Sequence, residues 1–128
     1  MEQKIKDQII DIGEENGWKV DISETSNPNI LEVTFSQYTN AGQDFYFEVE
    51  LKNYNIEDFI KNLGDYYESY DPDAEAYLWL GPDGHGKNGA PYRMVDVLKD
   101  MKQAEAMVSD LFDAFTNAND AREFEFKT

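Results

Sequence analysis

Three consecutive segments of this chain alternate apolar and polar residues, and this alternation limits the possible folds more than any other feature. The apolar positions are Trp18/Val20/Ile22, Leu31/Val33/Phe35 and Phe45/Phe47/Val49/Leu51. A period of two residues is typical of a strand with one buried face. The breaks between the segments, SNPN and TNAGQ, are short and rich in turn-forming residues, so consecutive strands are expected to pair antiparallel. The sequence therefore predicts a three-stranded meander with one face in water.

Helical periodicity precedes these strands. Three isoleucines recur at i, i+4 and i+7, at Ile5, Ile9 and Ile12. This spacing puts them on one face of an amphipathic helix that is expected to run from about Glu2 to Asn16. The glycine that follows is expected to end it.

Two further helices are predicted after the third strand. Asn55 is expected to cap the first of them. Its buried stripe is predicted at Ile56, Phe59, Ile60, Leu63 and Tyr67. Asp71 and Pro72 are expected to begin a second, short helix, because proline is favoured at the first helical position. The following AYLWL could equally extend as a strand, although the helix is favoured.

The longest periodic segment lies near the end of the chain. Its apolar positions recur every three or four residues, at Met94, Val97/Leu98, Met101, Ala104, Val108, Leu111/Phe112 and Phe115. They predict one long packed helix. Its near-heptad subset, Met94, Met101, Val108 and Phe115, could cover the sheet or a dimer interface. The sheet is favoured because three strands need a cover. The tail REFEFKT alternates weakly and is expected to be a frayed end or an edge strand.

Together these segments predict an α+β fold in one domain spanning residues 1–128. The order is an N-terminal helix, a three-stranded antiparallel meander, and two or three helices that cover the sheet (αβββααα). A chain of 128 residues is the size of one ordinary domain. Eight Phe, eight Tyr and two Trp supply the bulk of an interior.

Composition argues against several classes of function. The chain has no cysteine and one histidine, His85, so zinc and disulfide chemistry are not expected. There are 27 acidic and 11 basic residues, a net charge of −16. Nucleic acid should repel such a chain, since binding to phosphates depends on lysine and arginine. The N-terminus lacks the apolar core of a signal peptide, and no apolar run is long enough to span a bilayer. A cytoplasmic location is therefore expected.

The stretch LWLGPDGHGKNGAPY comes within one residue of a phosphate-binding signature. From Gly81 to Asn88 it fits G-x-x-x-x-G-K-[ST], except that Asn88 replaces the hydroxyl that would bind magnesium. A phosphate cradle also needs a helix that begins at Lys87, and Pro91 disfavours one there. The stretch is therefore interpreted as a connector, although an enzyme that uses it with His85 on a phosphorylated substrate is kept as an alternative.

Two other possible sites are weak. A lone histidine without a serine or cysteine partner is more often a loop residue than a catalytic base. DPDAE resembles a calcium loop only at its start, because Ala76 stands where glycine is required and Pro82 where glutamate is required. No cofactor or metal is expected.

Acidic residues are concentrated in one third of the chain. From Gln43 to Asp83 there are eleven acidic residues against two lysines, a net charge of −9. Tyrosines are interleaved with them at Tyr46, Tyr54, Tyr66, Tyr67 and Tyr70. One interpretation is a set of solvated strand and helix faces. The other is a binding surface for a basic partner, in which carboxylates occupy a lysine- and arginine-lined groove made for phosphates.

Several segments carry a resemblance to a known family. They are the first helix IKDQIIDI, the strand GWKVDIS, the hairpin ILEVTFSQYTNAGQDFYFEVE and the helix opening NIEDFIKNL, which cover about the first half of the chain. In element order, acidity and size the chain resembles the small phage-encoded anti-CRISPR inhibitors that act as DNA mimics on the type II RNA-guided nuclease. The segment GHGKNGAPY followed by an acidic amphipathic helix is similar to small proteins of phages and mobile elements.

This resemblance implies a non-enzymatic inhibitor, acting in the cytoplasm of a bacterial host, that blocks the DNA-binding groove of a defence nuclease. The surface it implies comprises Asp44, Glu48, Glu50, Asp65, Glu68, Asp71, Asp73 and Glu75, with Tyr67 and Tyr70 as anchors. An antirestriction protein and an immunity-type inhibitor of a basic toxin are the alternatives, because each target offers a cationic groove. The partner is expected to be a basic protein, with the chain itself a monomer or homodimer.

Overall fold

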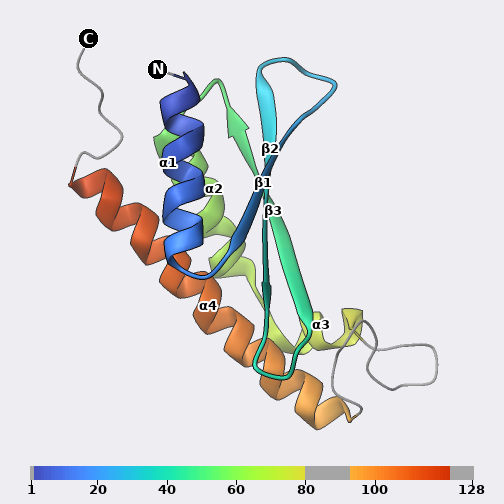
Figure 1. The fold of residues 1–128 in the computed structure, drawn as a ribbon. Helices are drawn as coiled ribbons and strands as arrows, with labels where there is room; N and C mark the ends of the chain where they lie inside the picture. The colour runs from blue at the N-terminus through green and yellow to red at the C-terminus, as the bar shows by residue number, and fades with distance from the viewer. Residues whose placement is uncertain (1, 80–92, 122–128) are drawn as a thin grey trace.

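The computed structural model describes residues 2–79 and 93–121, and it has the α+β architecture predicted from the sequence (Figure 1). The elements in chain order are α1 (Glu2–Glu15), β1 (Lys19–Glu24), β2 (Ile30–Tyr38), β3 (Asp44–Lys52), α2 (Ile56–Ser69), α3 (Pro72–Leu78) and α4 (Met94–Asp120). The order αβββααα is confirmed, with three helices after the sheet.

The sheet is an antiparallel meander in the order β1-β2-β3. Gly17 follows α1 with φ +86° and Gly42 lies in the β2–β3 hairpin with φ +91°. Both positions favour glycine because a Cβ is strained at such angles. The register pairs Phe35 with Phe47 and Val33 with Val49, so the apolar residues of neighbouring strands share one face. That face is buried, and the alternating polar residues occupy the other.

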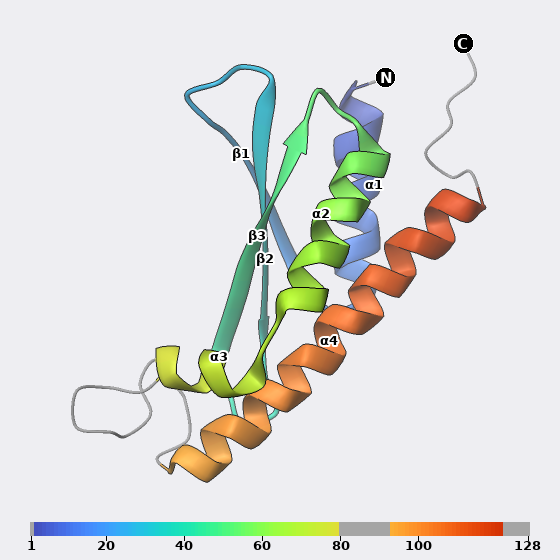
Figure 2. The same cartoon turned by 180° about the vertical axis from the view of Figure 1, so that it is seen from behind.

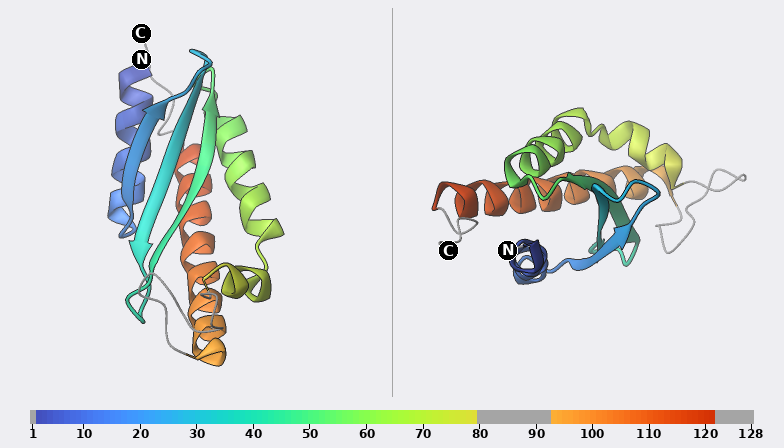
Figure 3. Two further views of the ribbon diagram at one scale, coloured as in Figure 1. Left: turned by 90° about the vertical axis from the view of Figure 1, so that its right-hand side faces the viewer. Right: turned by 90° about the horizontal axis from the view of Figure 1, so that it is seen from above.

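All the long helices lie on the apolar side of the sheet. Helix α4 lies along the apolar face of the sheet, α1 flanks the β1 edge and α2 flanks the β3 edge (Figure 3, left). The short helix α3 lies near the beginning of β3 (Figure 2). The opposite face of the sheet carries no helix in these views, as the meander pattern predicted.

Aromatic rings fill the space between the sheet and the helices. Phe35 meets Trp18, Phe59 and Phe115 at centroid distances of 6.3, 6.3 and 6.0 Å. The near-heptad residues Met101, Val108 and Phe115 of α4 are fully buried within the chain, and Met94 is half-buried. The stripe therefore covers the sheet of its own chain, which was the favoured interpretation.

The caps predicted for the helices after the sheet agree with the structure. Asn55 caps α2 as predicted, and its side chain accepts from the backbone N–H of Asp58 at 3.0 Å. Asp71 caps α3 with Pro72 in its first turn, so the segment through Leu78 is helical and the strand alternative is wrong. The loop Gly81–Asn88 with His85 and Lys87, and the tail REFEFKT, lie outside the described residues.

Candidate partner-binding site

The face of the sheet opposite the helices, which we call the open face, carries polar residues of all three strands. Across β2 and β3 the register places Glu32 opposite Glu50, Thr34 opposite Glu48, and Ser36 opposite Tyr46. Because successive side chains alternate between faces, these residues all point away from the helices. The open face therefore brings together carboxylates from separate strands.

Two neighbouring carboxylates act on Glu32. The pKa of Glu32 is raised above its ordinary value, first by the charge of Glu48, then by partial burial, a hydrogen bond with Glu48 and the charge of Glu50. Within the described residues, no ion pair neutralises any of the three. Like charges placed opposite each other destabilise a strand pair. We call Glu32, Glu48 and Glu50 the carboxylate cluster.

A pocket of about 560 Å³ opens beside this cluster, where β3 meets α2 and α3. It is lined by Tyr46, Phe47, Glu48, Tyr66, Glu75, Leu78 and Trp79. The rings of Tyr46 and Trp79 stand edge to face at 6.2 Å, and those of Phe47 and Tyr66 stack at 4.4 Å. We call this the aromatic pocket.

The polar groups of the aromatic pocket are partly desolvated. Burial raises the pKa of the Glu75 carboxyl, and an interaction with the side chain of Trp79 partly offsets this increase. Burial also raises the pKa of the Tyr66 hydroxyl, with a further contribution from the charge of Glu75. The pocket thus combines flat apolar walls with two carboxylates, Glu48 and Glu75.

A buried polar network supports one wall of the aromatic pocket. With the Gln43 amide oriented to satisfy both neighbours, its oxygen accepts from the Trp79 indole N–H at 3.2 Å and its nitrogen donates to Asp100 at 3.2 Å. The same carboxylate oxygen of Asp100 accepts from the hydroxyl of Thr39. Thr39, Gln43 and Asp100 are at most 5% exposed. The network joins the β2–β3 hairpin to α4 and to the end of α3.

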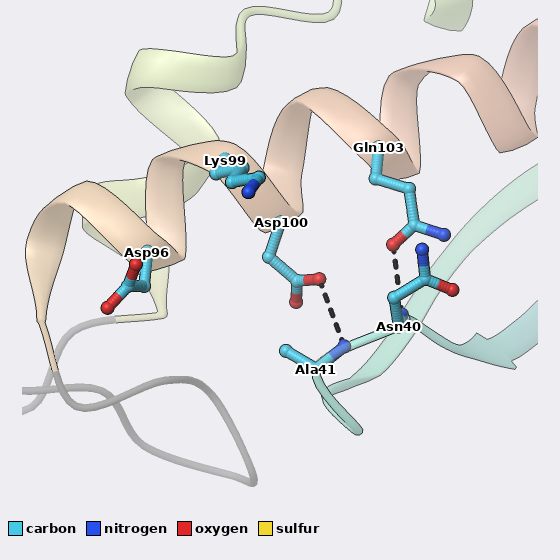
Figure 4. Close-up of a pocket in the computed structure, with 6 residues that line it drawn as sticks. All are labelled: Asn40, Ala41, Asp96, Lys99, Asp100 and Gln103. Carbon is cyan, nitrogen blue, oxygen red and sulfur yellow. Dashed lines mark hydrogen bonds between the residues drawn. The ribbon is translucent and has the colours of Figure 1, made fainter.

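A second pocket, of about 530 Å³, lies between the same hairpin and α4. The Gln103 side chain accepts from the backbone N–H of Asn40 at 2.9 Å, and Asp100 accepts from that of Ala41 at 3.4 Å (Figure 4). Lys99 and Asp96 line the same pocket. Gln103 and Asp100 thereby hold the hairpin turn on the helix.

The structure distributes the predicted acidic residues over three elements. Asp44, Glu48 and Glu50 lie on β3, and all are exposed on the open face. Asp65 and Glu68 are exposed on α2, where Lys61 lies 3.3 Å from Asp65. On α3, Asp73 is exposed and Asp71 caps the helix by accepting from the backbone N–H of Asp73 at 3.0 Å. Only Glu48 and Glu75 meet at one pocket.

The predicted anchors Tyr67 and Tyr70 differ from expectation. Tyr70 is 8% exposed, and its hydroxyl donates to the backbone carbonyl of Met101 at 2.8 Å. The prediction that Tyr70 is a surface anchor is therefore wrong, because its ring and hydroxyl are both used inside the chain. Tyr67 is half-buried and stacks on Phe112 of α4 at 6.4 Å, away from the aromatic pocket.

Among the residues of this site that sequence reasoning missed are Glu32 and Trp79. Glu32 lies outside the acidic stretch 43–83, yet it is the strand neighbour of Glu50. The alternation of the second strand already placed it on the polar face. Trp79 lies in the AYLWL segment, and no local pattern indicates that its indole meets Gln43.

Metal binding and membrane crossing find no support in residues 2–79 and 93–121. They contain no group of three or more histidine or acidic side chains placed to hold a metal ion. None of the helices described has the length and apolar character required to traverse a bilayer.

Comparison with protein-family models, curated proteins and solved structures finds no match to this chain.

Proposed function

We propose that this protein is a non-enzymatic inhibitor that occupies the DNA-binding groove of a basic nuclease. The observation that supports this function is the carboxylate cluster of Glu32, Glu48 and Glu50 on the open face. The charges of Glu48 and Glu50 disfavour the ionised form of Glu32, and within the described residues none of the three carboxylates forms an ion pair. A lysine- or arginine-rich partner would convert this repulsion into attraction.

The geometry of a strand pair suits the imitation of phosphates. Side chains two residues apart on one face are separated by about 6.6 Å along the strand, and neighbouring strands lie about 4.8 Å apart. Each DNA strand carries one charge per roughly 3.4 Å of helix axis. The open face therefore offers carboxylates at spacings of the same order as the phosphates that a nuclease groove receives.

The net charge of −16 adds a long-range contribution. A strongly acidic protein is steered towards a cationic groove, and its association slows as salt screens the field. Binding by this mechanism should weaken steeply between about 50 and 200 mM salt, as protein binding to DNA does. An interface held by apolar contacts would change much less.

The target class in this proposal is a bacterial defence nuclease, and an RNA-guided CRISPR effector is the first to test. Its groove reads the motif beside the target through arginines, which suits a carboxylate ligand. A restriction endonuclease and a basic nuclease toxin present similar grooves. They represent the antirestriction and immunity-type alternatives.

The test is displacement of labelled DNA from each of these three nuclease types by the purified protein. Displacement is expected at about 50 mM salt and should be much weaker at about 200 mM. The triple variant Glu32→Gln, Glu48→Gln, Glu50→Gln should lose displacement. The matched control removes three exposed charges of α1, through Asp11→Asn, Glu14→Gln and Glu15→Gln.

Two results would overturn the proposal. One is failure to displace DNA from any of the three nuclease types at low salt. The other is equal displacement by the triple variant and the wild-type protein, because the carboxylate cluster would then play no part.

A further inference from the structure

We infer that the aromatic pocket is a binding site for an arginine side chain of the partner protein. The inference deepens the proposed function and rests on it for the source of the arginine, which is the basic groove of the nuclease. The site is assigned from its walls and its charges. Both the walls and the charges belong to this chain, so the assignment of the site does not depend on a nuclease.

Aromatic rings provide the first part of the argument. Tyr46 is 55% exposed, and its ring stands against Trp79 at 6.2 Å with an interplanar angle of 79°. Tyr66 lines the same pocket and stacks on Phe47. An aromatic ring with one face open to a pocket attracts a cation through the negative potential of that face, most strongly where water is partly excluded.

The two carboxylates provide the second part. Glu48 comes from β3 and Glu75 from α3, so they reach the pocket from separate elements. Within the described residues, neither forms an ion pair with a lysine or arginine. Glu75 is half-buried, which makes its charge costly to keep without a cationic partner. A bound cation would meet a charge on each side.

The shape of the pocket favours arginine over other cations. Guanidinium is planar, stacks on aromatic faces and donates two parallel hydrogen bonds to a carboxylate. Leu78 and Phe47 line the same space and would cover the methylene stem of the side chain. A volume of about 560 Å³ accommodates the whole side chain. A metal ion is less suited, because calcium takes six to eight oxygen ligands.

The experiment uses the full protein and three small probes, the N-acetyl amides of arginine, lysine and citrulline. Citrulline keeps the shape of arginine without its charge. The chain has two tryptophans, so each indole N–H gives its own NMR signal. Trp79 lines the aromatic pocket, and Trp18 is 2% exposed in the core and serves as the internal reference.

The arginine probe should shift the Trp79 indole signal saturably, with a dissociation constant on the order of 1–10 mM, and leave Trp18 in place. Lysine should bind more weakly, and citrulline at least about tenfold more weakly. Glu48→Gln and Glu75→Gln should each weaken arginine binding by roughly tenfold. Tyr46→Leu removes an exposed ring and should weaken it by about threefold. The control Asp113→Asn removes an exposed charge of α4 that does not line the pocket.

The outcomes separate the pocket from the proposed function. Arginine binding without displacement of DNA from any nuclease would support the pocket and overturn the inhibitor. DNA displacement without a Trp79 shift would support the inhibitor and overturn the pocket. Equal binding of arginine and citrulline, or unchanged binding in both glutamine variants, would also overturn the pocket.

Discussion

Replacing Asp100 with alanine removes the acceptor at the centre of the buried network. The Thr39 hydroxyl and the Gln43 amide both donate to its carboxylate, and the backbone N–H of Ala41 approaches it at 3.4 Å. Thr39 is 5% exposed and Gln43 fully buried, so water does not readily replace the lost acceptor. Asp100→Ala therefore leaves two buried donors without a partner.

The size of the effect follows from these two donors. Each unsatisfied buried donor costs about 1–3 kcal/mol, which gives roughly 2–6 kcal/mol for the pair. Alanine recovers about 0.6 kcal/mol through its higher helix propensity. The free energy of unfolding should therefore fall by about 1.4–5.4 kcal/mol. Since a domain of this kind is stable by about 5–15 kcal/mol, a measurable folded population should remain in most of this range.

Urea denaturation followed by far-UV circular dichroism measures this loss. The control is Asp110→Ala, which removes an exposed carboxylate from the same helix and gains the same helix propensity. It should change the free energy of unfolding by no more than about 0.5 kcal/mol. A loss below about 1 kcal/mol for Asp100→Ala, or one equal to the control, would refute the reasoning, because the network would then contribute little.

Three further predictions concern packing, a buried hydroxyl and pH. Gly64→Ala places a Cβ 2.8 Å from Cε1 of Phe112, an overpacking cost of about 1–3 kcal/mol that a gain of about 1 kcal/mol in helix propensity partly offsets, so thermal denaturation should show a destabilisation of up to about 2 kcal/mol. Tyr70→Phe deletes a hydroxyl that donates to a backbone carbonyl of α4 at 2.8 Å and should cost about 1 kcal/mol in urea denaturation. The pKa of Glu32 is raised in the folded state, so the folded state binds more protons than the unfolded state just above pH 4.5. The free energy of unfolding should therefore rise as pH falls from neutral into that range. Glu32→Gln should raise the melting temperature at pH 7 and reduce this gain on acidification, whereas an unchanged pH profile would contradict the repulsion by Glu48.

The sheet could be predicted from the sequence because its determinants are local. Alternation fixes which residues of each strand are buried, and the short connections require antiparallel neighbours. The alternation and the short connection also predict the pairing of Glu32 with Glu50, since a hairpin centred on the turn 39–43 brings them opposite each other. The density of acidic residues along the chain does not reveal this pair, because Glu32 and Glu50 become neighbours only when the two strands are aligned across the hairpin.

The side-chain roles that sequence reasoning missed depend on distant contacts. Tyr70 lies seven residues beyond Leu63, so it continues the buried stripe of α2 just past the end of the helix. Whether a tyrosine there turns inward depends on the Met101 carbonyl, which lies 31 residues away. The meeting of Gln43 with Asp100 and Trp79 likewise joins three separate segments, and no local spacing encodes it.

Trp79 connects the buried network to the proposed arginine site. Its ring lines the aromatic pocket, while its N–H donates to Gln43, which in turn donates to Asp100. Trp79 follows a helix of seven residues, a short support for a large side chain, and the network restricts its orientation. A ring that is already oriented loses less entropy when a ligand binds.

Asp100 should therefore affect the aromatic pocket without lining it. Asp100→Asn keeps the size of the side chain and removes its charge, which weakens the bond from Gln43. We expect the Trp79 indole N–H signal to shift and arginine binding to weaken by about twofold to fivefold, with Trp18 unchanged. If the Trp79 signal and the arginine affinity both stay the same, packing alone orients the ring. The buried network would then stabilise the hairpin and nothing else.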